Sequence, residues 1–373
     1  MIVGPNSVII DLSALAANLR QFRDLVGPHI PIMGVVKSDA YGHGLLEVGR
    51  ALEKNGIDCL GVAFLHEAIL LREGGVRVPI VILCGIRTPE DSRQVIEKGL
   101  VPVLFDLSAA HALSEEARRQ GRKARVHVKV DTGMGRLGIP DADIGPFLQR
   151  IAALDHLEIE GLTTHLATAE EPDTRFTEDQ IRRFEAAIAV GRSLGLTLRH
   201  NSMANSAGIV CHKKARFDMV RPGIMLYGGR PSPAFAGTAS LVPVMHLKAR
   251  VVQVRDLPDK TPVSYGRTYT TGGPRRVAVL SAGYADGLPR ALSNKGKVLV
   301  AGKRADIIGT VCMNLTVCDI THHPHVRVGD EAVFLGPQEG ECLTGDDLAA
   351  WAGTISYEIF CAIGPRNKRT YIP

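Results

Sequence analysis

The 373-residue chain lacks the features that mark several large classes of protein. No stretch approaches the roughly 20 apolar residues that span a bilayer, so we expect no membrane segment. The seven cysteines are odd in number and form no CxxC pair, which argues against a disulfide framework or a zinc site. The net charge of +5 is spread along the chain without a basic block, and we therefore expect no nucleic-acid partner.

The N-terminus also lacks the pattern of an exported protein. No basic region precedes its short apolar run, and Asp11 follows early, unlike in a secretory signal peptide. Free thiols are typical of a reducing compartment, so we expect a soluble cytoplasmic protein. Hydrophobic residues at 45% and charged residues at 22% are ordinary globular values. The length exceeds one ordinary core and predicts a large domain joined to a smaller one.

The first two thirds of the chain alternate short apolar runs with helical patterns, such as the face formed by Leu15, Leu19 and Phe22. Near-continuous apolar runs are typical of parallel strands that are covered on both faces. We predict eight such strands, at 32–36, 59–64, 79–85, 101–106, 125–131, 157–166, 196–200 and 217–228. This number of βα units fits an α/β fold of the (β/α)8 TIM-barrel type, which typically has ~250 residues. A doubly wound sheet is the alternative, but no GxGxxG follows the first strand.

After residue 228 the composition and the hydrophobic pattern of the sequence change. The stretch 228–243 is rich in Gly, Pro and Ser and predicts a linker. Strand patterns with turn signals follow, at 246–257, 275–284, 297–309 and 326–336, and helical character is scarce except at 344–353. We therefore predict a barrel over residues 11–236 and a mostly β C-terminal domain over 237–373, which also takes up the N-terminal strand within residues 1–10.

Lys37 ends the first predicted strand, in the stretch VVKSDAYGHG. Strands often end in a charged residue that reaches water, and on that interpretation Lys37 is a solvated end cap. Side chains at the C-terminal end of a barrel strand, however, face the active site. A lysine there can form a Schiff base with the aldehyde of pyridoxal 5'-phosphate if its pKa is lowered.

Such a cofactor also needs a cup for its phosphate, which barrels often build after strands seven and eight. The chain offers NSAG at 205–208 and RPGI at 221–224 in those places. Ser206 can donate a hydroxyl, Gly223 and Ile224 can present backbone N–H groups, and Tyr41 supplies a phenol. Each is weak alone, because Ser and Gly in loops are usually turn residues.

These residues stand in a series of motifs that resembles the alanine racemases over nearly the whole chain. The series runs, in the order of that family, VVKSDAYGHG, HVKVDTGMGRLG, HLATAEE, MANSAG, VRPGIMLYG, VSYGRTYTT, SAGYADGLPR, GTVCMNLTVCDI and GTISYEIF. The resemblance implies a pyridoxal-phosphate enzyme of fold type III that works as a head-to-tail homodimer with shared active sites. It further implies interconversion of L- and D-alanine, with D-alanine supplied for peptidoglycan.

Racemisation takes a proton from one face of Cα and delivers one to the other, which two opposed groups do most simply. The resemblance implies that Lys37 is one group and that Tyr265, from the partner subunit, is the other. A phenol with a pKa of about 10 is a poor base at neutral pH. The resemblance implies that His165 and Arg221 supply the electropositive setting it needs. Without these motifs, Tyr265 would be interpreted as a packing residue.

Arg221 is expected at the ring nitrogen of the cofactor, with Asn205 and Tyr357 among the other cofactor-binding residues. A guanidinium only donates hydrogen bonds. It would leave the ring nitrogen unprotonated and weaken the electron sink, which suits a racemase better than a decarboxylase.

The resemblance also implies contacts to an amino-acid substrate. Arg136 would fork onto the substrate carboxylate, a geometry that lysine cannot copy, and the backbone N–H of Met313 from the partner subunit would assist. Lys129 would lie near Arg136 and is a candidate for carbamylation, with an ordinary salt-bridged lysine as the alternative.

The match departs from the family at the entrance and the inner pocket. Tyr284 and Arg290 resemble gate residues, but Asn314 stands where aspartate is usual and Thr310 where many members have arginine. Glu170 also replaces the usual aspartate. These differences leave the reaction unchanged and raise the expectation that serine is accepted beside alanine.

Two alternatives stay open at this stage. A pyridoxal-phosphate homeostasis protein would resemble the barrel alone, so the second domain argues against it. A basic amino-acid decarboxylase of the same fold type would place a carboxylate where Arg221 stands, although Cys312 and Cys361 could serve as its substrate-binding cysteine.

Overall fold

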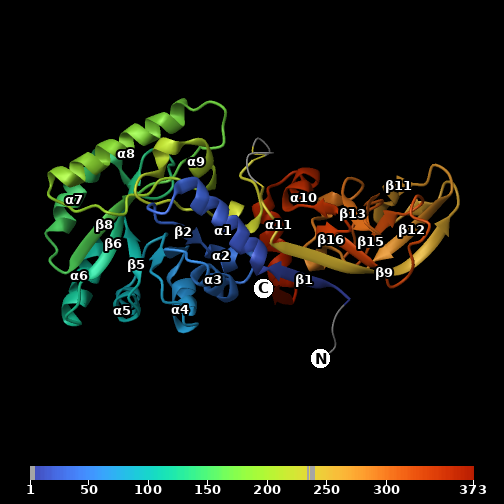
Figure 1. Ribbon diagram of the computed structural model, residues 1–373, viewed down its shortest axis with the longest axis horizontal. Coiled ribbons are helices and arrows are strands. Elements are labelled where there is room, and N and C mark those ends of the chain that lie inside the picture. Colours follow the sequence, from blue (N-terminus) through green and yellow to red (C-terminus); the bar gives the residue numbers. More distant parts are fainter. Residues whose placement is uncertain (1–4, 233–234, 236–239) are drawn as a thin grey trace.

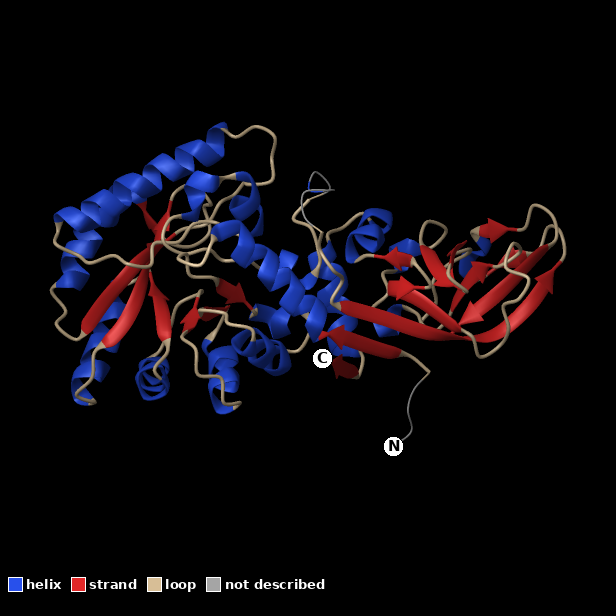
Figure 2. Ribbon diagram, viewed as in Figure 1, coloured by secondary structure: helices blue, strands red, loops and turns tan. Residues whose placement is uncertain are grey.

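The computed structural model describes residues 5–232, 235 and 240–373, which form two units joined side by side (Figure 1). One unit combines strands with surrounding helices, and the other is built mostly of strands (Figure 2). The predicted linker at 228–243, the boundary between residues 236 and 237, and the start of the predicted strand within 1–10 fall partly outside the described residues. These domain bounds stay a prediction.

Parallel strands form the wall of the first unit. Its regular strands are β2 (Met33–Val35), β3 (Cys59–Val62), β4 (Ile80–Ile82), β5 (Val101–Leu104), β6 (Ala124–Asp131) and β8 (Leu157–Thr163), with a short β7 (Ile139–Pro140) beside β6. They pair in the order β2-β3-β4-β5-β6-β8. Isolated parallel bridges continue from Thr163 to Ser202, from Ser202 to Met219 and from Val220 to Ile32. The wall therefore closes, and the predicted barrel with its β C-terminal domain is confirmed.

The segments predicted as strands seven and eight are not regular strands, and both predictions were wrong. In 196–200, the backbone N–H groups of Arg199 and His200 both donate to the Glu160 carbonyl, so no ladder forms. In 217–228, Pro222 has no N–H to give, and a 3-10 helix, η3 (Ile224–Tyr227), follows at once. Single bridges at Ser202 and at 219–220 take the place of the two strands.

Helices cover the outside of the barrel. They are α1 (Leu12–Val26), α3 (Leu45–Lys54), α4 (Leu65–Glu73), α5 (Pro89–Lys98), α6 (Leu107–Arg119), α7 (Ile144–Ala152), α8 (Arg175–Ser193) and α9 (Ser206–Cys211). The Asp11 side chain caps α1 by accepting a hydrogen bond from the Ala14 N–H (2.9 Å). The predicted face of Leu15, Leu19 and Phe22 is buried, as the 3.6-residue period requires.

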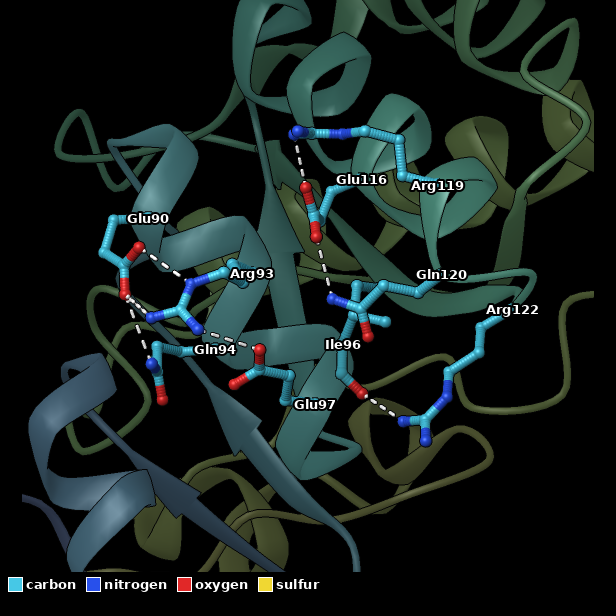
Figure 3. A network of polar contacts seen from close by, with 9 residues as sticks. All are labelled: Glu90, Arg93, Gln94, Ile96, Glu97, Glu116, Arg119, Gln120 and Arg122. Carbon is cyan, nitrogen blue, oxygen red and sulfur yellow. Dashed lines mark hydrogen bonds and ion pairs between the residues drawn. The ribbon is translucent and has the colours of Figure 1, made fainter.

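The outermost helices carry polar contacts at the protein surface (Figure 3). Arg93 of α5 pairs with Glu90 and Glu97 of the same helix. Arg122, beyond α6, donates to the Ile96 carbonyl at 2.8 Å and ties the two helices together. Exposed ion pairs add little to the free energy of folding, so the apolar core carries most of the stability.

The second unit is built on a curved sheet that includes the N-terminal strand. Its strands are β1 (Ser7–Asp11), β9 (Met245–Leu257), β12 (Arg275–Leu280), β13 (Lys297–Val300), β14 (Lys303–Asp306), β15 (Thr316–Asp319), β16 (Glu331–Gln338), β17 (Glu341–Leu343) and β18 (Arg369–Ile372), with a hairpin of β10 (Pro262–Val263) and β11 (Tyr269–Thr270). β1 pairs antiparallel with β9 and parallel with β18. The long β9 therefore connects the start of the chain to the rest of the sheet.

Two helices of this unit lie next to the barrel, α10 (Gly345–Ala352) and α11 (Ser356–Ile363) (Figure 1). The pattern at 344–353 predicts α10, whereas α11 was missed, because Ile355 at its start supplies no side-chain cap. α11 packs tightly against the segment after Lys37. A Cβ on Gly42 would lie 2.4 Å from the Phe360 carbonyl oxygen. No described helix is long and apolar enough to cross a membrane.

Candidate active site

A cavity of about 430 Å³ lies at the C-terminal ends of the barrel strands. It brings together all the site residues predicted on the barrel and on α11, namely Lys37, Tyr41, Lys129, Arg136, His165, Asn205, Ser206, Arg221, Gly223, Ile224 and Tyr357. Because β2, β4, β6 and β8 all end at this cavity, it has the usual position of a barrel active site.

Lys37 enters the cavity from the start of a left-handed turn, α2 (Lys37–Tyr41). Residues 38–41 have φ values of 53° to 56°, a conformation that costs about 1–2 kcal/mol per non-glycine residue. The Ser38 N–H donates to Glu67 Oε1 at 2.5 Å. Asp39 accepts from the Leu45 N–H and pairs with Arg369. The turn is therefore held from both sides, and it points Lys37 and Tyr41 into one cavity.

The cavity is electropositive. Lys37, Lys129, Arg136 and Arg221 line it, and no acidic side chain of the described residues does. Burial and the nearby Arg136 lower the pKa of Lys37 from its usual value. Burial, Arg221 and Arg136 hold the pKa of Lys129 well below its usual range. An amine with a lowered pKa is a better nucleophile at neutral pH, and the cavity as a whole favours an anionic ligand.

Arg221 is buried without a carboxylate partner among the described residues. Its guanidinium donates to Thr163 Oγ1 (3.0 Å), to Ser202 Oγ (2.6 Å) and to the Thr164 carbonyl (2.5 Å). Burial lowers the pKa of Arg221 to about 10, so it stays charged at neutral pH. His165 Nδ1 lies 3.4 Å from Arg221 Nη2, and burial next to Arg221 holds the pKa of His165 well below its usual range.

Two of the groups that hold Arg221 had no recognised signal in the sequence. Thr163 is the first of two adjacent threonines at the end of β8, two residues before His165, and no motif in the sequence assigned it a role. Ser202 follows Asn201 in a second Asn-Ser pair, three residues before the pair at 205–206 that the motif singled out. The structure assigns the two pairs different places, since Ser202 supports Arg221 and Ser206 supports Gly223.

A cup lies where NSAG and RPGI meet. Asn205 caps α9 by accepting from the Gly208 N–H at 2.9 Å. Ser206 Oγ accepts from the Gly223 N–H at 2.9 Å, which leaves its hydroxyl hydrogen free to donate to an anion. A Cβ on Gly223 would lie only 2.6 Å from the Tyr41 hydroxyl oxygen. Glycine is therefore required for the close approach of this loop to Tyr41.

Two tyrosines face this cup. The rings of Tyr41 and Tyr357 lie 5.8 Å apart, and Tyr227 packs on the other side of Tyr41 at 4.9 Å. Burial raises the pKa of both Tyr41 and Tyr357. Both phenols therefore stay neutral and can donate hydrogen bonds to an anion.

The residues predicted to come from the partner subunit lie elsewhere in the single chain. Tyr265, in the 3-10 helix η5 (Tyr265–Arg267), is 72% exposed, and Met313 is 55% exposed. Neither lines the cavity. Tyr284 and Arg290 line a different cavity of about 420 Å³, beside α10 and α11. One chain alone does not bring any of these four residues to Lys37.

The residues that depart from the family pattern also have definite places. Thr310 is buried, and its Oγ1 donates to the Tyr265 carbonyl at 2.8 Å. Asn314 is exposed beside Met313. Glu170 lies close enough to Tyr357 to help raise the pKa of that phenol.

Comparisons with known proteins agree with this arrangement. Two family models match, the alanine racemase N-terminal domain over residues 10–231 and the alanine racemase C-terminal domain over 244–371. The alanine racemase of Geobacter sulfurreducens is 43% identical over 376 residues, covering 99% of this chain and 97% of the relative.

Solved structures match over the whole length as well. The alanine racemase from Streptomyces coelicolor A3(2) has a TM-score of 0.92 and 37% identity, covering 99% of this chain and 98% of that one. The alanine racemase from Bartonella henselae with covalently bound pyridoxal phosphate has a TM-score of 0.88 and 30% identity, covering 99% of this chain and 100% of that one. The chain therefore belongs to the alanine racemase family, whose members are pyridoxal-phosphate-dependent isomerases.

Proposed function

We propose that this protein interconverts L- and D-alanine by two-base proton transfer, with pyridoxal 5'-phosphate held on Lys37. The observation that carries the proposal is the cavity itself. Four basic side chains and no acidic one line it, and no described residue forms an ion pair with Lys37. Such a site suits a phosphate and a substrate carboxylate together with a nucleophilic amine. Membership of the family argues against the decarboxylase and homeostasis alternatives.

The residues present fit this cofactor. Lys37 would hold it covalently, as in the Bartonella henselae structure. The Ser206 hydroxyl, the Ile224 backbone N–H and the phenols of Tyr41 and Tyr357 would receive its phosphate, with Asn205 and Gly223 shaping the cup. When bound, pyridoxal phosphate supplies an electron sink that acidifies the Cα–H of an attached amino acid.

Protons at Cα would then be moved by two groups of the protein. Lys37 Nζ would serve one face, and the hydroxyl of Tyr265 of the partner subunit the other. Arg136 would hold the substrate carboxylate, assisted by the backbone N–H of the partner subunit's Met313. This arrangement requires a homodimer, because Tyr265 and Met313 are exposed and lie outside the cavity of their own chain.

Arg221 would donate to the ring nitrogen of the cofactor. Thr163, Ser202 and Thr164 already fix its guanidinium, and a guanidinium has no acceptor atom. The ring nitrogen would remain unprotonated, and the electron sink would be weaker than with a carboxylate partner. Proton exchange at Cα depends less on a strong electron sink than decarboxylation does, so this arrangement favours a racemase.

Lys129 is proposed to be carbamylated. Its lowered pKa favours the neutral amine, which is the form that adds carbon dioxide, and Arg136 and Arg221 would stabilise the resulting anion. The alternative is an unmodified lysine. Intact-protein mass spectrometry under gentle conditions distinguishes the two.

The pathway and the substrate range are also proposals. We expect D-alanine to serve peptidoglycan synthesis in the cytoplasm, a compartment consistent with the seven free cysteines. Thr310 and Asn314 replace residues that are usually charged in the family, and Glu170 is a longer carboxylate near Tyr357, so we expect slower turnover of serine beside that of alanine.

The test is to incubate the cofactor-loaded protein with L-alanine, and separately with L-serine, in heavy water, followed by chiral separation and mass spectrometry. Deuterated D-alanine is the expected product, with less D-serine. Deuterium in L-alanine without any D-isomer would contradict two-base transfer. No exchange from a yellow, loaded protein would favour a cofactor carrier.

A Tyr265→Phe variant tests the second base. We expect it to stop exchange from one enantiomer of alanine while Lys37 still exchanges the Cα proton of the other. Equal loss of exchange from both enantiomers would contradict the assignment of Tyr265.

A further inference from the structure

Three potential metal ligands meet inside the barrel wall, away from the catalytic cavity. They are His127 on β6, Glu160 on the neighbouring strand β8 (Figure 1), and His200, in the irregular segment just before Ser202. His127 Nε2 and His200 Nδ1 each lie 3.9 Å from Glu160 Oε2. One ligand atom from each residue lies within 4.8 Å of the other two.

The distances between these ligand atoms fit a shared metal ion better than a hydrogen bond. A separation of 3.9 Å is too long for a hydrogen bond, yet it is close to the spacing of two atoms that share an ion with bonds of about 2.0–2.2 Å. His127 is 2% exposed, and its Nδ1 has no hydrogen-bond partner among the described residues. Nε2 is the nitrogen that faces Glu160 and would bind an ion, and the unpaired Nδ1 shows that no hydrogen bond among the described residues holds the ring in another role.

The cluster opens to solvent on the side of Glu160 and His200, at the N-terminal end of the barrel, while His127 stays buried behind them. A cavity of about 470 Å³ is lined by Glu160 and His200 together with Lys123, just before β6, and Leu157, the first residue of β8. Neither Glu160 nor His200 lines the catalytic cavity. An ion could therefore enter without passing the catalytic cavity.

The backbone holds the three residues together. A Cβ on Gly161 would lie 2.4 Å from the His200 carbonyl oxygen, so glycine permits the segment at 200 to lie against β8. Arg125 Nη1 approaches Glu160 Oε1 at 3.4 Å. That contact orients the carboxylate and leaves Oε2 facing both imidazoles.

We propose that His127, Glu160 and His200 bind one divalent transition-metal ion of the zinc class. Two imidazoles and one carboxylate are a common ligand set for such an ion, with water completing the coordination. The ion would cross-link the barrel wall where Ser202 supplies only a single bridge in place of strand seven. The N-terminal face of a barrel serves stability rather than catalysis, so the ion is expected to raise the melting temperature and leave racemisation unchanged.

The test uses the metal-stripped, cofactor-loaded full-length protein. Zinc binding is followed by titration calorimetry, cobalt by its visible ligand-field absorption, and stability by the melting temperature. We expect one high-affinity ion per chain and a higher melting temperature. His200→Ala and Glu160→Gln should each weaken binding at least about 100-fold, because losing a ligand exceeds the cost of losing an outer-shell partner.

Matched variants separate this site from surface histidines. His156→Ala removes a histidine at the same end of the barrel, which contacts the Arg122 carbonyl, and His322→Ala removes one from the His-rich segment at 322–325. Both should leave the ion and the melting shift intact. Binding lost in these controls but kept in Glu160→Gln would overturn the proposal. Absence of any bound ion would also overturn it and assign the space to a water molecule.

Discussion

A Cβ atom on Gly223 would lie 2.6 Å from the Tyr41 hydroxyl oxygen, closer than non-bonded atoms approach. We predict that Gly223→Ala displaces Tyr41 from the cup. Overpacking of this kind costs about 1–3 kcal/mol. We expect this cost in the cofactor-bound cup, where it raises the Kd for pyridoxal phosphate by roughly 5- to 150-fold. Titration of the apo-protein with the cofactor, followed by absorbance, measures this change.

Two further variants decide whether the contact with Tyr41 is the cause. Gly272→Ala is the matched control, because a Cβ there meets no atom within 4 Å, and its Kd should not change. Tyr41→Phe removes the hydroxyl that clashes, so the double variant should recover apo-protein stability lost in Gly223→Ala. Without that recovery, the effect of Gly223→Ala lies in the loop backbone instead.

His43 links stability to pH at the residue scale. Burial lowers its pKa to about 3 from an ordinary 6.5. Below pH 6.5, His43 binds a proton in the unfolded chain but stays unprotonated in the folded protein until the pH approaches 3. Stability is therefore complete above pH 6.5 and is lost as pH falls toward about 3, by up to about 1.4 kcal/mol per pH unit.

We predict that His43→Gln flattens this loss, although the variant itself is less stable at neutral pH. Urea unfolding of both proteins across this pH window measures the two slopes. His156→Gln, at a partly exposed position, should keep the slope of the original protein. Parallel slopes for the original protein and His43→Gln would show that other groups dominate the acid sensitivity.

At the scale of elements, the left-handed turn of α2 stores backbone strain beside Lys37. Ala40 is fully buried with a φ of 53°, where glycine is favoured over alanine by about 1–2 kcal/mol. We predict that Ala40→Gly leaves the melting temperature unchanged or raises it. Ala68→Gly, at an equally buried position in the right-handed helix α4, should lower the free energy of unfolding by about 1 kcal/mol. An equal loss in both variants would show that the turn is unstrained.

The accuracy of the sequence predictions differs along the barrel for a physical reason. The first six strands are apolar runs whose backbone groups pair with neighbouring strands, so composition predicts them. At the position of the seventh strand, a side chain replaces a backbone hydrogen-bond partner. Asn201 Oδ1 accepts from the Leu162 N–H (3.0 Å), a place that a backbone carbonyl would fill in a regular strand. A hydrogen bond from a side chain in place of the backbone produces no periodic pattern of apolar residues in the sequence. The eighth run is interrupted by Pro222 and Gly223, and its apolar residues pack as η3 instead.

The residues of the candidate site were easier to predict from the sequence than the contacts that hold Arg221 from behind. Lys37, Arg136 and Arg221 stand in motifs at strand ends, where chemistry and position coincide. The network behind Arg221 joins Thr163 and Ser202, which lie 39 residues apart in sequence. Such contacts arise only when the barrel closes, so one sequence does not reveal them.

At the scale of the whole molecule, the chain divides its proposed chemistry between two distant surfaces. Lys37 lies in the barrel cavity, while Tyr265, Met313 and Leu315 are exposed on the second unit. Large apolar side chains exposed together mark an interaction surface. The proposed head-to-tail pair would bury this surface against the barrel of the other copy and would complete two equivalent sites by symmetry.

This division predicts that two inactive variants complement each other. Lys37→Ala and Tyr265→Phe should each be inactive as homodimers, since every site lacks one base. A hybrid dimer has one site with both defects and one with none. After mixing, unfolding and refolding in equal amounts, about half of the dimers are hybrids, so activity should recover to about a quarter of the original value. Each variant refolded alone is the control. No recovery, from a mixture shown by mass spectrometry to contain hybrids, would place both bases in one subunit.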